Sequence, residues 1–89
     1  HKDMQPGQWS DLGMFIQSFL LTATEAGLGT CAQEAWSIYP TTVKTAAGIP
    51  ADFTLFCVIA LGHGDPDAPV NTTRTERAGV DEFASFAGF

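Results

Sequence analysis

The sequence predicts an α+β fold in which a long helix, a short helix and one strand are followed by an extended tail. Apolar residues recur at helical spacing between about residues 9 and 27, and residues 53–61 form a run that is continuously apolar after Thr54. Glycine- and proline-rich turns separate these segments. The change from helical spacing to a continuous apolar run indicates a change from helix to strand.

The first helix is expected over about residues 9–27, after a polar lead-in at residues 1–8 that we expect to be a loop. Ser10 or Asp11 can cap its start, and Gly27 and Gly29 stop it. One helix face carries a stripe of apolar residues spaced three and four apart: Leu12, Phe15, Ile16, Phe19, Leu20, Ala23 and Ala26.

A second apolar stripe on this helix consists of residues seven apart, Met14, Leu21 and Leu28. A helix with apolar residues on two sides is expected to be sandwiched. We therefore expect one side to pack inside the subunit and the other to meet a partner subunit.

A short helix is predicted over residues 40–47, because Pro40 suits a first turn and Gly48-Ile49-Pro50 is a stop signal. Residues 54–61 are predicted to be a strand buried on both faces, as in the middle of a covered sheet. In the tail, apolar residues recur every third position, and we expect it to dock on another surface as an extended arm or a short helix. These residues are Val80, Phe83, Phe86 and Phe89.

Composition limits the class of protein. The chain has 89 residues, enough for one domain, yet 45% of them are hydrophobic and seven are Phe. Such a load suggests burial against a second chain or a missing segment. The net charge of −6 argues against a nucleic-acid or acidic-membrane surface. Cys31 and Cys57 lack metal or disulfide spacing, and we expect reduced thiols, no signal peptide, no membrane span and a cytoplasmic location.

Two segments could carry chemistry. The glycine-rich segment 27–36 either presents free backbone N–H groups to a flat ring or an oxyanion, or is a plain helix end followed by an irregular loop. Arg74 and Arg77 either clamp a phosphate with forked hydrogen bonds or are solvated surface residues. Trp36 and Tyr39 either line a pocket or belong to the core.

Other polar residues are weaker candidates. His63, between two glycines, is expected in an exposed loop, and Asp65 and Asp67 are expected in a solvated turn and not at a metal site. A general-acid role for Glu34 and Glu76 is not expected. No catalytic side chain and no metal ligand is therefore assigned.

Several blocks together resemble the FMN-dependent nitroreductase family, and the resemblance is to the C-terminal part of such a protein. In chain order the blocks are Asp11-Leu12-Gly13-Met14-Phe15, Gly27-Leu28-Gly29-Thr30-Cys31, Gln33-Glu34-Ala35-Trp36, Ala60-Leu61-Gly62-His63 and Arg74-Thr75-Glu76-Arg77. The resemblance implies that residues 1–89 are a partial nitroreductase-like domain, with a long central helix, whose N-terminal portion is absent.

The resemblance also implies a cofactor site. Gln33, Glu34 and Ala35 would lie at FMN, with the amide of Glu34 or Ala35 facing N5 of the flavin; many family members have Glu-Gly where this chain has Glu34-Ala35. Arg74 and Arg77 would bind the FMN phosphate, and Arg77 is the better match.

The implied activity is oxidoreduction in a homodimer. NAD(P)H would reduce the flavin, which would pass electrons to a nitroaromatic, quinone or similar acceptor. Two alternatives stay open. The chain could be a non-catalytic dimerising fragment or partner subunit that binds no flavin, or it could belong to a branch with other chemistry, such as the dehalogenases or the enzymes that fragment flavin.

Overall fold

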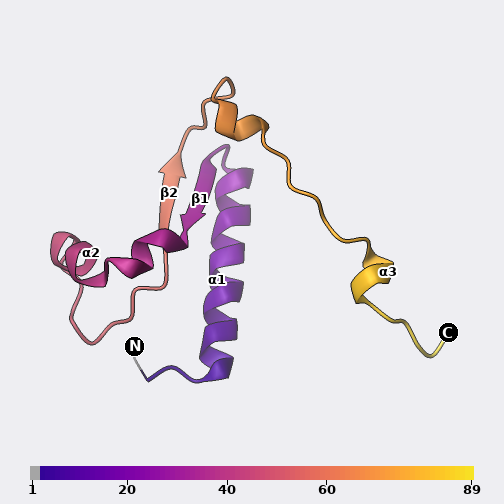
Figure 1. The fold of residues 1–89 in the computed structure, drawn as a ribbon, viewed down its shortest axis with the longest axis horizontal. Coiled ribbons are helices and arrows are strands. Elements are labelled where there is room, and N and C mark those ends of the chain that lie inside the picture. The colour runs from indigo at the N-terminus through magenta and orange to yellow at the C-terminus, as the bar shows by residue number, and fades with distance from the viewer. Residues whose placement is uncertain (1–2) are drawn as a thin grey trace.

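The computed structural model describes residues 3–89 and has the α+β composition that the sequence predicts (Figure 1). In chain order the elements are α1 (Pro6–Glu25), β1 (Gly29–Gln33), the 3-10 helix η1 (Glu34–Ile38), α2 (Pro40–Ala47), β2 (Val58–Gly62), the 3-10 helix η2 (Pro69–Thr72) and α3 (Val80–Phe83).

Helix α1 begins at Pro6, which is earlier than predicted. Pro6 was expected in the lead-in loop but occupies the first position of the helix. Proline lacks an N–H that the first turn would leave unpaired, and its φ suits a helix. The backbone N–H of Gln5 donates to Gln8 Oε1 at 2.8 Å. The expected cap at Ser10 or Asp11 is wrong, since the Ser10 hydroxyl donates back to the Pro6 carbonyl oxygen at 3.3 Å. Gly27, at φ +77°, reverses the chain after the helix.

Helix α2 has the predicted bounds. Pro40 takes its first position, and Gly48, in the left-handed conformation at φ +65°, ends it. The Ile49 N–H then returns to the Lys44 carbonyl oxygen at 2.9 Å, which satisfies a carbonyl of the last turn.

The sheet consists of β1 and β2, which pair antiparallel from Gly29 opposite Gly62 to Gln33 opposite Val58. Strand β1 was not expected, because residues 29–33 were read as irregular. Strand β2 covers only the second half of the predicted run 54–61 and continues to Gly62.

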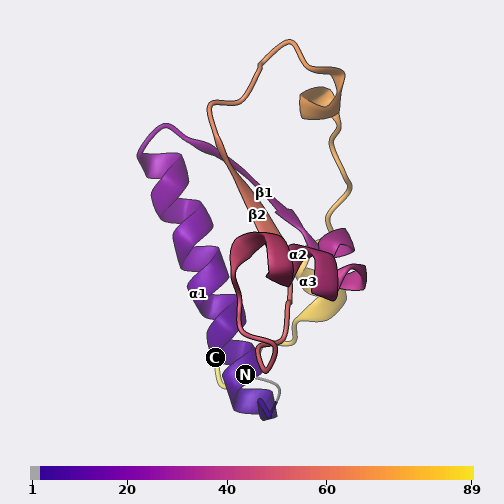
Figure 2. The same cartoon turned by 90° about the vertical axis from the view of Figure 1, so that its left-hand side faces the viewer.

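The predicted burial of this strand on both faces is wrong for the described residues. Val58 and Ile59 are half-buried, whereas Ala60 and Leu61 are exposed. The reason is the architecture: β1 is the single hydrogen-bonded neighbour of β2, and α1 packs beside β1 (Figures 1 and 2).

The core lies between α1 and the sheet. Within residues 3–89 the sole buried hydrophobic residue is Ala23, from the first predicted stripe, at 7% exposure. Near the start of α1 the Trp9 ring lies against Phe56, with ring centroids 5.6 Å apart. On the opposite side of α1, Met14 and Leu21 are 62% and 61% exposed. Leu28, the third member of the second stripe, lies beyond the helix and is half-buried.

Residues 73–89 form a C-terminal arm that leaves the rest of the molecule (Figure 1). The arm is extended except for α3, where the Gly79 N–H donates to Glu82 Oε1 at 2.8 Å. The radius of gyration is 17.0 Å, compared with about 12 Å for a compact domain of this length. Phe83 and Phe86 are 71% and 70% exposed, so the arm does not fold back on the body of its own chain.

Candidate functional site

The first predicted site residues lie where β1 passes into η1. Gln33 is the last residue of β1, and Glu34 and Ala35 open η1. A 3-10 helix bonds each N–H to the carbonyl three residues earlier, so its first N–H groups have no partner inside the helix. The amides of Glu34 and Ala35 belong to this first turn.

The glycine-rich segment before this turn does not present free backbone N–H groups along its whole length, as one interpretation of the sequence expected. Residues 29–33 do not form a free loop: they pair with β2 and so share their backbone groups with that strand. A Cβ at Gly29 would lie 3.4 Å from the Gly62 carbonyl oxygen and 3.5 Å from the Gly64 nitrogen. Gly29 therefore lies close to the loop that follows β2, at a distance where a Cβ would make ordinary van der Waals contact.

Two side-chain contacts of Gln33 were missed by the sequence analysis. Trp36 Nε1 donates to Gln33 Oε1 at 2.6 Å, and Gln33 Nε2 donates to Cys31 Sγ at 3.8 Å. The spacing of three residues between Gln33 and Trp36 was a possible signal, but not a specific one. Trp36 and Tyr39 are 46% and 57% exposed, so neither is a core residue within residues 3–89.

The predicted phosphate ligands lie in the C-terminal arm, between η2 and α3. Arg74 Nη1 donates to the carbonyl oxygens of Asn71 at 3.0 Å and Thr73 at 3.2 Å. Arg77 Nη1 donates to the carbonyl oxygens of Glu76 at 3.0 Å and Thr75 at 3.3 Å, and to Thr75 Oγ1. Both side chains are exposed, and these bonds engage Nη1 alone.

The two arginines are three residues apart in sequence, but the structure does not place them beside η1. Beyond η2 the arm runs away from the sheet, while η1 leads toward α2 on the other side of the molecule (Figure 1). In the described chain the predicted site is thus in two parts, the β1–η1 turn and the arginine segment 74–77.

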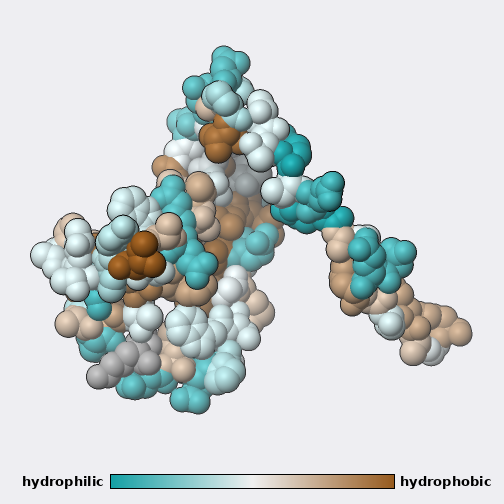
Figure 3. Space-filling view, viewed as in Figure 1, coloured by the Kyte–Doolittle hydropathy of each residue, from teal (hydrophilic) through white to brown (hydrophobic). Residues whose placement is uncertain are grey.

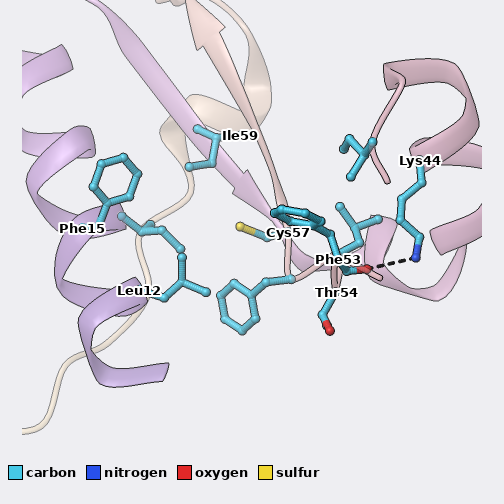
Figure 4. Close-up of a pocket in the computed structure, with 11 residues that line it drawn as sticks. Leu12, Phe15, Lys44, Phe53, Thr54, Cys57 and Ile59 are labelled. Carbon is cyan, nitrogen blue, oxygen red and sulfur yellow. Dashed lines mark hydrogen bonds between the residues drawn. The ribbon is translucent and has the colours of Figure 1, made fainter. Parts of the chain in front are cut away.

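A hydrophobic groove of about 280 Å³ lies between α1, α2 and residues 53–59. In Figure 4, Leu12 and Phe15 project from α1 on one side, Lys44 reaches in from α2 on the other, and the Cys57 sulfur lies between them. Lys44 Nζ donates to the carbonyl oxygens of Ala51 and Phe53, each at 3.0 Å. The ammonium therefore holds the α2–β2 connection in place.

A second groove, of about 310 Å³, runs along the upper ends of β1 and β2 and includes His63 and Asn71. In the loop that follows β2, Asp65 Oδ1 accepts the Asp67 N–H at 2.9 Å, which confirms the turn expected there. Neither groove is lined by a predicted site residue.

Residues 3–89 contain no group of three or more His, Cys, Asp or Glu side chains placed to hold a metal ion. Among the same residues, no helix combines the length and hydrophobicity needed to cross a bilayer.

Comparison with known proteins identifies the fold and the family. The sequence pattern of the Nitroreductase family matches residues 1–63. The 4-nitrobenzoate reductase of Pseudomonas putida is 33% identical over 81 residues, which is 91% of this chain and 36% of that protein. The 4-nitrobenzoate reductase of Nocardioides sp. (strain LMS-CY) is 37% identical over 76 residues, which is 85% of this chain and 31% of that protein.

Solved structures agree. The FMN and NADPH-dependent nitroreductase NfnB of Sphigopyxis sp. strain HMH superposes with a TM-score of 0.89 at 44% identity, over 97% of this chain and 39% of that one. The FMN-dependent nitroreductase NfnB of Mycobacterium smegmatis, in complex with NADPH, superposes with a TM-score of 0.90 at 30% identity, over 97% of this chain and 38% of that one.

The matches also show how much of each relative's length this chain covers. The chain spans about a third of the length of these curated relatives, 36% and 31%. The structural matches cover 97% of this chain, so most of the C-terminal arm is included in them. From the family pattern over residues 1–63 and these superpositions, the chain belongs to the nitroreductase family.

Proposed function

We propose that this chain is the C-terminal portion of an FMN-dependent oxidoreductase that passes electrons from NAD(P)H to nitroaromatic, quinone or similar acceptors. The observation that carries the proposal is the superposition on NfnB of Mycobacterium smegmatis, whose structure was solved with NADPH, at a TM-score of 0.90 over 97% of this chain. Bound FMN would supply the redox chemistry, and the protein would supply binding and orientation.

The donor chemistry of this chain suits FMN. The first turn of η1 offers the N–H groups of Glu34 and Ala35, which can donate to a flavin ring nitrogen. Arg74 and Arg77 use only Nη1 in their hydrogen bonds, so Nε and Nη2 of each guanidinium remain to form forked bonds with a phosphate. The backbone N–H groups thus suit the flavin ring of FMN, and the guanidinium groups suit its phosphate.

We also propose that the protein is a homodimer located in the cytoplasm. Met14 and Leu21 are largely exposed on the side of α1 that faces away from the sheet. The three Phe of the arm are exposed as well, and Figure 3 shows apolar surface along the arm and between α1 and α2. An exposed apolar surface of this extent is typical of an interface.

The alternative is a non-catalytic dimerising fragment or partner subunit that binds no flavin. The separation of the arginine segment from η1 in the described chain favours this alternative. A full-length form of the protein that takes up no FMN would support it and would contradict the proposed function.

The decisive experiment is titration of FMN into a full-length form of the protein, as the parent, and into its Arg77→Ala variant, with riboflavin as the control ligand. Loss of a charge-assisted contact should cost about 1.5–3 kcal/mol, or roughly ten- to a hundredfold in FMN affinity. Riboflavin lacks the phosphate, so its affinity should barely change. Arg77→Lys, which keeps the charge but loses the fork, should fall between the parent and Arg77→Ala.

Two results would count against this assignment. Equal losses for FMN and riboflavin would mean that Arg77 acts through folding and not through the phosphate. An FMN affinity that equals that of the parent would remove Arg77 from the site.

A further inference from the structure

The Gln33 side chain connects the end of β1 to the middle of η1. Its Oε1 accepts the Trp36 indole N–H at 2.6 Å, and its Nε2 donates to Cys31 Sγ at 3.8 Å. The first bond is short for an N–H···O contact, and the second is a weak bond to sulfur. Both ends of the Gln33 amide are therefore engaged by this chain itself.

The backbone on the strand side of this connection is fixed. Cys31 and Gln33 are two residues apart and lie on one face of β1, opposite Ala60 and Val58 of β2. The register of the sheet sets the position of the Gln33 Cα, and the hydrogen bond to Trp36 passes that restraint on to η1.

Few other contacts restrain η1. It has five residues, none of which is buried, and a 3-10 helix of this length has little stability of its own. At its far end the Tyr39 N–H donates to the Trp36 carbonyl oxygen at 3.0 Å, where the chain enters α2. Trp36 is therefore held by its indole toward β1 and by its carbonyl toward α2, and Glu34 and Ala35 lie between Gln33 and this anchor.

We infer that Gln33 is a positioning residue for the flavin site, a role that rests on the proposed function. Its side chain binds Trp36 and not the cofactor. By fixing Trp36 it sets the direction of the backbone N–H groups of Glu34 and Ala35. Preorganised donors bind a ligand more tightly than donors that must first be ordered.

The test uses variants that remove each side of the bond. Gln33→Met keeps the length of the side chain and removes the strong acceptor, and Trp36→Phe keeps a ring and removes the donor. Gln33→Glu keeps an acceptor oxygen at the same length and serves as the conservative control. All are compared in the FMN-loaded protein, together with the double variant.

Gln33→Met and Trp36→Phe should each weaken FMN binding about three- to tenfold, the size expected for one neutral hydrogen bond. The double variant should lose no more than either single variant, because both remove the same bond. Gln33→Glu should weaken FMN binding less than Gln33→Met, because it keeps an acceptor for the Trp36 indole N–H. The midpoint potential of the bound flavin should move in the same direction in Gln33→Met and Trp36→Phe, which a purely structural role would not cause.

The bond itself is measured without flavin. The indole N–H signal of Trp36 in a ¹H–¹⁵N spectrum should move on Gln33→Met, while that of Trp9 should stay. An unmoved Trp36 signal, additive losses in the double variant, or an FMN affinity and potential equal to the parent in Gln33→Met would each overturn the inference and leave the proposed function standing. A parent protein that binds no FMN would overturn both.

Discussion

Replacing Leu21 by aspartate should dissociate the proposed dimer. Leu21 is 61% exposed on the side of α1 that faces away from the sheet. Full burial of a leucine side chain is worth about 1.5–3 kcal/mol, so covering the exposed share would contribute roughly 1–2 kcal/mol per subunit. In a two-fold dimer the residue counts twice, which gives roughly 2–4 kcal/mol and a dimer dissociation constant raised roughly 30- to 1,000-fold. Burial of an unpaired carboxylate would raise it further.

The measurement is sedimentation velocity of the parent and the variant over a range of protein concentrations. Thr22→Asp is a matched control: it adds the same charge to the same helix, about 100° around its axis. Thr22 is an exposed residue whose hydroxyl donates to the Ser18 carbonyl oxygen at 2.9 Å. The control should dimerise nearly as the parent does.

Two results would refute the reasoning. A parent that remains a monomer at every concentration would mean that this face of α1 is open to solvent. Equal weakening by Leu21→Asp and Thr22→Asp would mean that added negative charge acts through the net charge of −6 and not through a covered leucine.

The remaining predictions concern stability and are measured by urea unfolding, as a midpoint change at constant m-value. Lys44→Met keeps the aliphatic stem but removes both bonds to the Ala51 and Phe53 carbonyls, and it should lower the free energy of unfolding by about 1–3 kcal/mol; Lys44→Arg should lose less. An unchanged midpoint for Lys44→Met would contradict that role. Gly48→Ala should cost about 1 kcal/mol, because the residue has φ +65° although nothing lies within 4 Å of the added Cβ. Gly13→Ala, inside α1 and equally unobstructed, should instead stabilise by about 0.5–1 kcal/mol, and equal signs for the two would refute the backbone argument.

Helix ends were predictable where a residue type alone fixes the backbone. Pro40 and Gly48 bound α2 at the predicted positions, and Gly27 ends the turn after α1. The start of α1 was missed because Pro6-Gly7 is equally typical of a loop, whereas in the structure the N–H groups of Gln8 and Trp9 donate to the Gln5 carbonyl oxygen and so begin the helix.

Strand β1 was not predictable from local sequence. Its residues, Gly-Thr-Cys-Ala-Gln, have little of the β-branched and aromatic content that marks a strand. What makes it a strand is β2, whose first residue follows the end of β1 by a long connection through η1 and α2. A pairing of this kind depends on tertiary structure, as does the exposure of Ala60 and Leu61.

The candidate site was predictable as residues but not as an arrangement. The family resemblance pointed to Gln33, Glu34, Ala35, Arg74 and Arg77, and their assignment to FMN stays a prediction. No sequence pattern indicates that the Gln33 amide is engaged by Trp36, since a spacing of three residues allows many side-chain pairs. The sequence also gives no sign that the two arginines lie in an arm directed away from η1.

Because few of the described residues are buried, we expect ligand binding by this chain to depend on its assembly with another subunit. Although 45% of the chain is hydrophobic, Ala23 is the sole buried hydrophobic residue within residues 3–89. The β1–η1 turn is therefore held by strand pairing and by the Gln33–Trp36 bond, with little core beneath it. Local order of this kind changes easily when a neighbouring surface is covered. If a second subunit covers Leu21, FMN affinity should rise with protein concentration in the parent and lose that dependence in Leu21→Asp, because binding and assembly are then linked.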